Sequence, residues 1–167
     1  MTTLFLLRHA KAVKASGGMK DFDRPLDPRG VEDIARIGGE MAKRFALPER
    51  VLCSASRRTR ETLTGLGLPF REDQVEFSRK LYEAEADGYL RELQGEQAAA
   101  LLLVGHNPAT EELAGMLADE GGDAEARGRL AKGFPTSGLA VFDFDGSLGD
   151  LAPGRATLRA FLTPDRG

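Results

Sequence analysis

The sequence contains only two histidines, and each follows a run of apolar residues. His9 comes after the run 3–7, and His106 comes after the run 99–104. Such runs are typical of strands that are buried on both faces of a parallel sheet. Ligands of α/β proteins bind beyond the carboxyl ends of these strands. We therefore expect the two imidazole rings to meet at one sheet edge, where histidine can serve as a nucleophile or as a proton donor and acceptor.

Position alone leaves two other interpretations of the histidine pair open. Each ring is an independent structural group, or the two rings bind a metal ion together with an aspartate. The metal-dependent hydrolase is the weaker alternative, because neither histidine lies in a motif with the spacing of metal ligands.

Arginines accompany the first histidine and the end of a second apolar run. Arg8 directly precedes the first histidine, and the segment 54–62 carries Arg57, Arg58 and Arg60. We expect Arg57 and Arg60 to lie on a solvated helix face. Arg58 instead falls at a strand-to-helix junction, where it can join Arg8. Guanidinium groups bind phosphate oxygens in a bidentate manner, and a helix N-terminus adds free N–H donors, so the sequence predicts an oxyanion pocket.

Strands and helices alternate along most of the chain, which favours an α/β fold with a largely parallel sheet. The expected strands are 3–7, 50–53, 75–77, 99–104, 139–144 and 157–162. The segments 86–93 and 109–117 are expected to be helices, and the Gly-rich, charged segment 120–133 is expected to be a long loop.

Cap residues mark two further helices. Asp27 and Pro28 are typical of an N-cap followed by the first helical position, and Pro48 should end that helix. Ser54 is expected to cap the next helix, which should run to about Gly65.

Composition limits the classes of partner. The chain has 167 residues, of which 41% are hydrophobic, so we expect a single domain over residues 1–167. The net charge of −3 argues against general binding to nucleic acid or to a membrane surface. The single cysteine, Cys53, is expected to be a buried structural thiol, and the absence of a signal peptide or membrane span predicts a cytoplasmic protein.

Four motifs, in this order along the chain, resemble those of the histidine phosphatase superfamily, which has the phosphoglycerate-mutase-like fold. They are Leu7-Arg8-His9-Ala10, the segment 54–62, Leu81-Tyr82-Glu83 and Gly105-His106-Asn107-Pro108. The resemblance spans residues 3 to 162 and implies a three-layer α/β/α sandwich with a mostly parallel central sheet. The short chain and the stretch 23–30 are most similar to the SixA branch, whose members are described as phosphohistidine phosphatases acting on histidine phosphotransfer domains.

The resemblance also implies a role for each motif residue. His9 matches the nucleophile, which becomes transiently phosphorylated. Arg8, Arg58 and His106 match the residues that hold the phosphoryl oxygens, and Glu83 matches the general acid. No metal or other cofactor is implied.

The sequence departs from the superfamily pattern at two positions, and the acid is the least certain assignment. Ala10 replaces the usual glycine, and Ala55 replaces the usual proline, but neither change removes a reacting group. Glu83 has four competitors for the role of general acid, namely Asp21, Asp23, Glu85 and Asp87.

The expected substrate is a phosphohistidine on a phosphotransfer protein. The segment between the second and fourth expected strands is too short to form a lid, so we expect an open, shallow site. The alternatives are a small-molecule phosphomonoesterase or mutase with the same chemistry, and a non-catalytic module that binds phosphate or a phosphopeptide. We expect no nucleic-acid or membrane partner, and a monomer or weak dimer.

Overall fold

A six-stranded sheet forms the centre of the molecule in the computed structural model, which describes residues 1–164. The strand order is β3-β2-β4-β1-β5-β6. Their bounds are β1 Thr2–Arg8, β2 Arg50–Ser54, β3 Val75–Ser78, β4 Ala100–Gly105, β5 Leu139–Phe144 and β6 Thr157–Leu162. β1 to β4 are parallel to one another, whereas β5 is antiparallel to both β1 and β6. The expectation of a mostly parallel sheet is confirmed.

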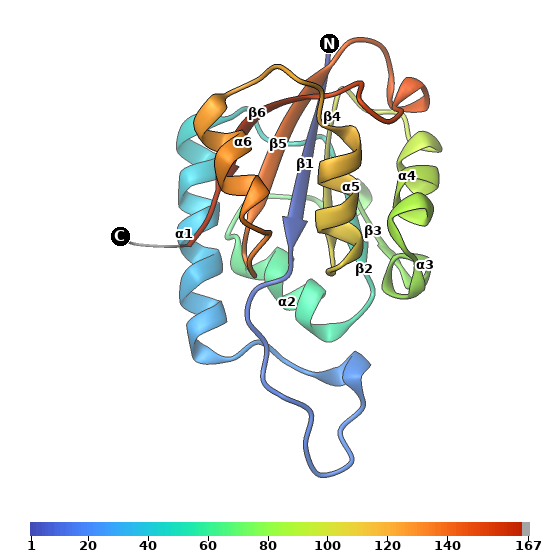
Figure 1. Ribbon diagram of the computed structural model, residues 1–167. Helices are drawn as coiled ribbons and strands as arrows, with labels where there is room; N and C mark the ends of the chain where they lie inside the picture. The colour runs from blue at the N-terminus through green and yellow to red at the C-terminus, as the bar shows by residue number, and fades with distance from the viewer. Residues whose placement is uncertain (165–167) are drawn as a thin grey trace.

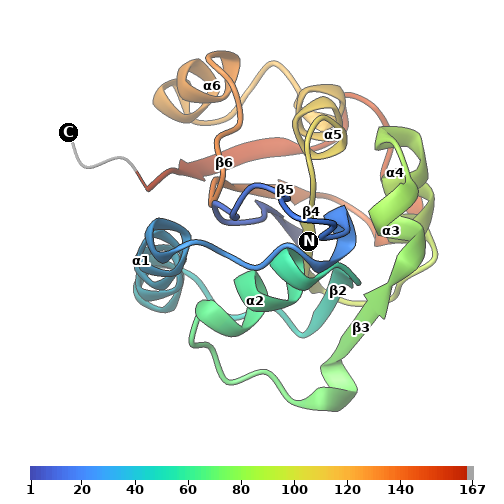
Figure 2. The same cartoon turned by 90° about the horizontal axis from the view of Figure 1, so that it is seen from below.

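Helices cover both faces of the sheet, as Figures 1 and 2 show. One face carries α1 (Pro28–Arg44) and α2 (Arg57–Gly65), and the other carries α4 (Ala86–Gln94), α5 (Ala109–Leu117) and α6 (Ala124–Ala131). The short α3 (Arg79–Glu83) follows β3. Two separate apolar clusters, one on each side of the sheet, fill the two interfaces. The fold is therefore the three-layer α/β/α sandwich that the motifs imply.

The pairing of β1 with β4 sets the position of both histidines. In this parallel ladder Arg8 lies opposite Gly105, so each histidine leaves the sheet at the same level. The backbone N–H of His9 donates to the carbonyl of Gly105 over 3.0 Å, which extends the ladder by one residue. Side chains that follow these two strands must therefore emerge next to each other.

The helix caps agree with the sequence for α1 and differ for α2. Asp27 accepts a hydrogen bond from the backbone N–H of Gly30 over 2.8 Å, with Pro28 in the first helical position, as expected. The N-cap of α2 is Ser56 rather than Ser54. The reason is that Ser54 still pairs with Ser78 in the β2–β3 ladder, so the helix begins two residues later than predicted.

The segment 120–133 is not a long loop, because its middle forms α6. Asp123 caps this helix by accepting a hydrogen bond from the backbone N–H of Ala126 over 2.9 Å. Ala126 is buried and joins the same apolar cluster as α4 and α5. The glycines of the segment hid this helix, although every one of its residues except Gly128 is a good helix former.

No helix within residues 1–164 is long and apolar enough to cross a membrane.

Candidate active site

The two histidines lie together beyond the carboxyl ends of β1 and β4, as the sequence predicts. Their ring centroids are 5.4 Å apart, and the ring planes are tilted by 58°. Arg8 precedes one ring, and Arg58, from the first turn of α2, approaches the other. The structure thus brings four of the five expected site residues to one place.

His9 has the protonation state that a nucleophile needs. Its Nδ1 lies 2.7 Å from the carbonyl oxygen of Ala10, and because a carbonyl only accepts, Nδ1 carries the proton. No other hydrogen bond reaches this ring within residues 1–164, so Nε2 keeps its lone pair free. Burial lowers the pKa of His9 to about 4, and the charges of Arg58 and Arg8 act in the same direction. The imidazole is therefore neutral at physiological pH.

His106 is held on both ring nitrogens. A guanidinium nitrogen of Arg58 lies 3.4 Å from Nδ1, which must accept because arginine only donates. Nε2 then carries the proton and donates to the hydroxyl of Ser54 over 2.7 Å. The pKa of His106 is lowered to about 3, mainly by burial and further by the charges of His9 and Arg58. Ser54, proposed from the sequence as a helix cap, instead orients this ring.

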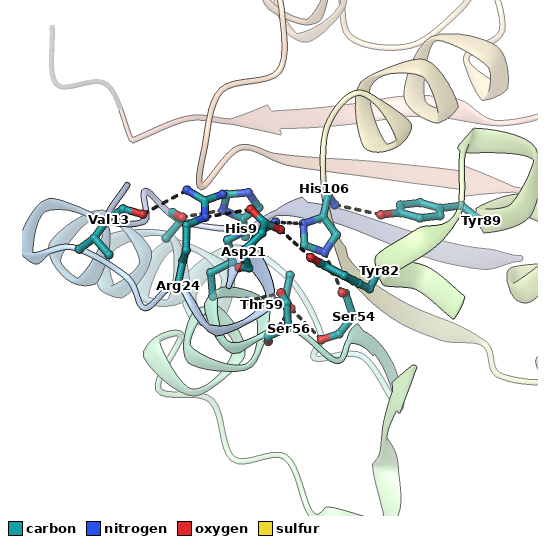
Figure 3. A network of polar contacts seen from close by, with 12 residues as sticks. His9, Val13, Asp21, Arg24, Ser54, Ser56, Thr59, Tyr82, Tyr89 and His106 are labelled. Carbon is teal, nitrogen blue, oxygen red and sulfur yellow. Dashed lines mark hydrogen bonds and ion pairs between the residues drawn. The ribbon is translucent and has the colours of Figure 1, made fainter. Parts of the chain in front are cut away.

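The backbone of His106 is fixed from beneath by α4. Its N–H donates to the hydroxyl of Tyr89 over 3.0 Å, a contact that Figure 3 shows to the right of the ring. The preceding residue must be glycine, because a Cβ at Gly105 would lie 2.7 Å from Cε2 of the Tyr89 ring. Tyr89 therefore ties the end of β4 to the helical layer, and sequence analysis gave no signal for it.

The two arginines retain donors that no protein group uses. Arg8 donates from Nη1 to the carbonyl of Phe134 over 2.9 Å, and its buried Nε has no partner among the described residues. The buried Nε of Arg58 is likewise without a hydrogen-bond partner in residues 1–164. Unsatisfied cationic donors around a neutral histidine are suited to binding a phosphoryl group.

The loop between β1 and α1 reaches over this edge of the sheet. Figure 1 shows it extending beyond the carboxyl ends of the strands, and it contains a short 3-10 helix, Asp21–Asp23. Arg58 donates to the Asp21 backbone carbonyl over 2.8 Å and to Asp21 Oδ2 over 3.1 Å. Tyr82 also donates to Oδ2 over 2.7 Å, and Arg24 donates to Oδ1 over 3.0 Å. The expectation of an open site rests on the short segment between β2 and β4, and this loop after β1 is additional material over the same edge.

The expected general acid, Glu83, is not brought to the two histidines. It ends α3 with a side chain that is 67% exposed, and its Oε1 lies 3.7 Å from Arg79. Of the four competitors, Asp23, Glu85 and Asp87 are also exposed, and within residues 1–164 they form no hydrogen bond or ion pair with the histidines or with Arg58. Asp21 alone among these carboxylates contacts an expected site residue in the described part of the chain.

The described residues also bear on metal binding and on thiol chemistry. Within residues 1–164 no three His, Cys, Asp or Glu side chains are grouped so that they could hold a metal ion. Cys53 is buried, and burial raises the pKa of its thiol to about 12, so the thiol is structural, as expected.

The depressed histidine pKa values predict that acid destabilises the protein. In the unfolded chain both histidines bind a proton as the pH falls below about 6.5. In the folded protein His9 binds one only near pH 4, and His106 only near pH 3. The stabilisation is therefore complete above pH 6.5 and is lost as the pH falls. Each histidine should lower the free energy of unfolding by roughly 2 kcal/mol between pH 7 and pH 5.

Urea unfolding at pH 7 and pH 5 measures this loss. His106→Gln should reduce the pH dependence by about half, since one of two such groups is removed. A variant that keeps the full pH dependence would show that His106 is not the group that titrates.

Comparison with known proteins gives close matches along the whole chain, although no protein-family model matches the sequence. An uncharacterized protein of Mycobacterium tuberculosis is 38% identical over 163 residues, which cover 95% of this chain and 99% of that protein. A solved SixA structure from Nakamurella multipartitia, provisionally named a phosphohistidine phosphatase, has a TM-score of 0.84 and 31% identity, covering 98% of this chain and 96% of that one. A similarly named SixA structure from Agrobacterium tumefaciens has a TM-score of 0.79 and 33% identity, covering 98% and 99%.

Proposed function

Because the chain belongs to the histidine phosphatase superfamily, within its SixA-like branch, we propose that it hydrolyses phosphohistidine on a phosphotransfer protein through a phosphorylated His9. The similar SixA structures carry the name phosphatase, which supports a hydrolase. The phosphohistidine substrate, the protein partner and the phosphoenzyme are our proposal.

The observation that carries the proposal is the state of His9. Its Nδ1–H is bound by the Ala10 carbonyl, so the lone pair of Nε2 is the group left to attack phosphorus. Arg8 and Arg58 supply positive charge and unpaired N–H donors near this ring, and the His106 ring lies 5.4 Å away from it, centroid to centroid. Transfer of a phosphoryl group requires such positive groups, because negative charge spreads over its equatorial oxygens. An Nδ1 with no backbone acceptor would leave the nucleophilic tautomer unfixed.

The reaction proceeds in two displacements. Nε2 of His9 forms a bond to phosphorus as the bond to the substrate nitrogen breaks, and that nitrogen keeps the electron pair. Water then attacks the phosphorus of phospho-His9 as the bond from phosphorus to Nε2 breaks, and Nε2 recovers the electron pair. The water loses a proton to solvent or to a nearby base, and inorganic phosphate is released. Splitting one displacement into two replaces a high barrier with two lower ones.

The exposed position of Glu83 favours a phosphohistidine over an alkyl phosphate. An alkoxide leaving group needs a proton from a positioned acid, whereas an imidazole that is protonated on its other nitrogen leaves as a neutral molecule. Glu83 pairs with Arg79 on the surface and makes no contact with the phosphoryl-binding residues. A site without a positioned acid suits a substrate with a good leaving group.

The direct test compares two substrate classes, with EDTA present throughout. A phosphohistidine-bearing phosphotransfer domain and a panel of phosphate monoesters are each incubated with the purified protein and with its His9→Ala variant. Rapid, His9-dependent loss of phosphohistidine with poor monoester turnover is the expected result. Efficient monoester turnover would move the function to small-molecule metabolism, and no turnover of either class would favour a binding module.

A further inference from the structure

We propose that Asp21 is a specificity-determining residue, which favours substrates whose leaving group presents an N–H and disfavours phosphomonoesters that carry a second anionic group. The inference deepens the proposed function and rests on it. In the described part of the chain, Asp21 is the only acidic residue whose side chain contacts Arg58.

The contacts of Asp21 place a negative charge within the phosphate-binding group. Its Oδ2 accepts from Arg58 over 3.1 Å and from Tyr82 over 2.7 Å, while Arg24 donates to Oδ1. The Arg58 nitrogen that reaches Oδ2 also lies 3.4 Å from Nδ1 of His106. A phosphoryl oxygen that binds the Arg58 guanidinium must therefore lie close to the Asp21 carboxylate.

The carboxylate remains both charged and accessible. The hydrogen bond from Tyr82 lowers the pKa of Asp21 to about 2, and the charges of Arg58 and Arg24 act in the same direction. Asp21 is therefore an ionised hydrogen-bond acceptor at neutral pH, and not a proton donor, in this arrangement. Its side chain is 53% exposed, in contrast to that of Arg58 at 7%, so an incoming substrate can reach the Asp21 carboxylate.

A phosphohistidine matches this arrangement. When the nitrogen away from phosphorus is protonated, the ring carries positive charge and donates an N–H, which a carboxylate accepts. As the bond from phosphorus to nitrogen breaks, the electron pair moves to the leaving nitrogen, and the ring departs as neutral imidazole with the other proton still in place. Asp21 stabilises the protonated ring without taking its proton.

An anionic monoester meets the opposite effect. Phosphoglycerate, for example, brings a carboxylate into the space that Asp21 already makes negative, and like charges at close range in a partly desolvated site repel. A repulsive group that acts only on the wrong substrate is a general route to specificity. Asp21 would therefore exclude metabolites that Arg8 and Arg58 alone would attract.

The test compares Asp21→Asn with Asp23→Asn, a matched control in the same 3-10 helix. Asp23 is exposed and, in the described part of the chain, forms no hydrogen bond or ion pair with Arg8, Arg58 or either histidine. For each protein, kcat/KM is measured with a phosphohistidine-bearing phosphotransfer domain and with 3-phosphoglycerate, and the Kd for inorganic phosphate is measured by calorimetry. Asp21→Asn should shift the ratio of the two kcat/KM values towards 3-phosphoglycerate by roughly tenfold and should bind phosphate several-fold more tightly. Asp23→Asn should match the wild type in all three.

The phosphate measurement separates this inference from the proposed function. A residue that only positions Arg58 would weaken phosphate binding when altered, so weaker or unchanged binding by Asp21→Asn overturns the inference. An unchanged substrate ratio overturns it too. If the wild type does not turn over phosphohistidine and Asp21→Asn still binds phosphate more tightly, the proposed function is wrong while the charge effect of Asp21 stands.

Discussion

Replacing His9 with alanine is expected to abolish phosphoenzyme formation and to reduce turnover by at least about 10³-fold, because the variant lacks the imidazole nitrogen that we propose attacks phosphorus. The fold should persist, since His9 lies beyond the end of β1 and not within either apolar cluster. The measurement is incorporation of labelled phosphate from a phosphohistidine donor, followed by rapid quench at alkaline pH, where phosphohistidine is stable.

Lys11→Ala is the matched control for this variant. Lys11 lies two residues away, is largely exposed and has one ion pair, to Asp27 at 3.9 Å. Its alanine variant should label like the wild type. If His9→Ala retained the label, the nucleophile would have to be another residue, and His106 would be the next to replace.

Replacing Arg58 with alanine should have the second largest effect. Removal of one donor to a developing oxyanion costs roughly 2–4 kcal/mol of transition-state stabilisation in enzymes of comparable design, or about 10²–10³-fold in rate. Arg58 contributes more than a donor to phosphate, because it also binds Asp21 and holds His106 Nδ1 as an acceptor. We therefore expect kcat/KM to fall by about 10²–10³-fold.

Arg57→Ala controls for the loss of positive charge near the site. Arg57 is adjacent in sequence, but its side chain is 57% exposed and pairs with Glu61. Exposed ion pairs contribute little, so this variant should keep nearly full activity and stability. A decrease of less than tenfold in kcat/KM for Arg58→Ala would remove Arg58 from the site.

It could be predicted from the sequence that the four main site residues lie together, because each of them lies at or just after the end of a predicted strand. Continuous apolar runs predict buried parallel strands, and parallel strands end at a common edge. His9 and His106 follow β1 and β4, which are adjacent in the sheet, and Arg58 follows β2, the next strand along. The expected residues therefore met through topology, without any knowledge of side-chain contacts.

Contacts between distant loops could not be predicted in this way. Asp21 reaches Arg58 because the loop after β1 bends back over the sheet edge, and no periodic pattern encodes that bend. The role of Tyr89 could not be predicted for a different reason. Its ring and hydroxyl lie against Gly105 at the end of β4, whereas an aromatic residue in a helix is usually only part of the core. Ser54 was assigned to the wrong role because two serines two residues apart both fit an N-cap, and only strand pairing decides between them.

The position of β1 has a consequence for how the protein is synthesised. β1 lies in the interior of the sheet, yet its two neighbours start at Ala100 and Leu139, far later in the chain. At 5–20 residues per second, the ribosome needs on the order of 5–20 s after β1 to supply even the first neighbour, and during that time an apolar strand has both edges unpaired. We expect the nascent chain to depend on chaperone binding near its N-terminus, and the catalytic edge to form only late in translation, when β4 and β5 enclose β1 from both sides.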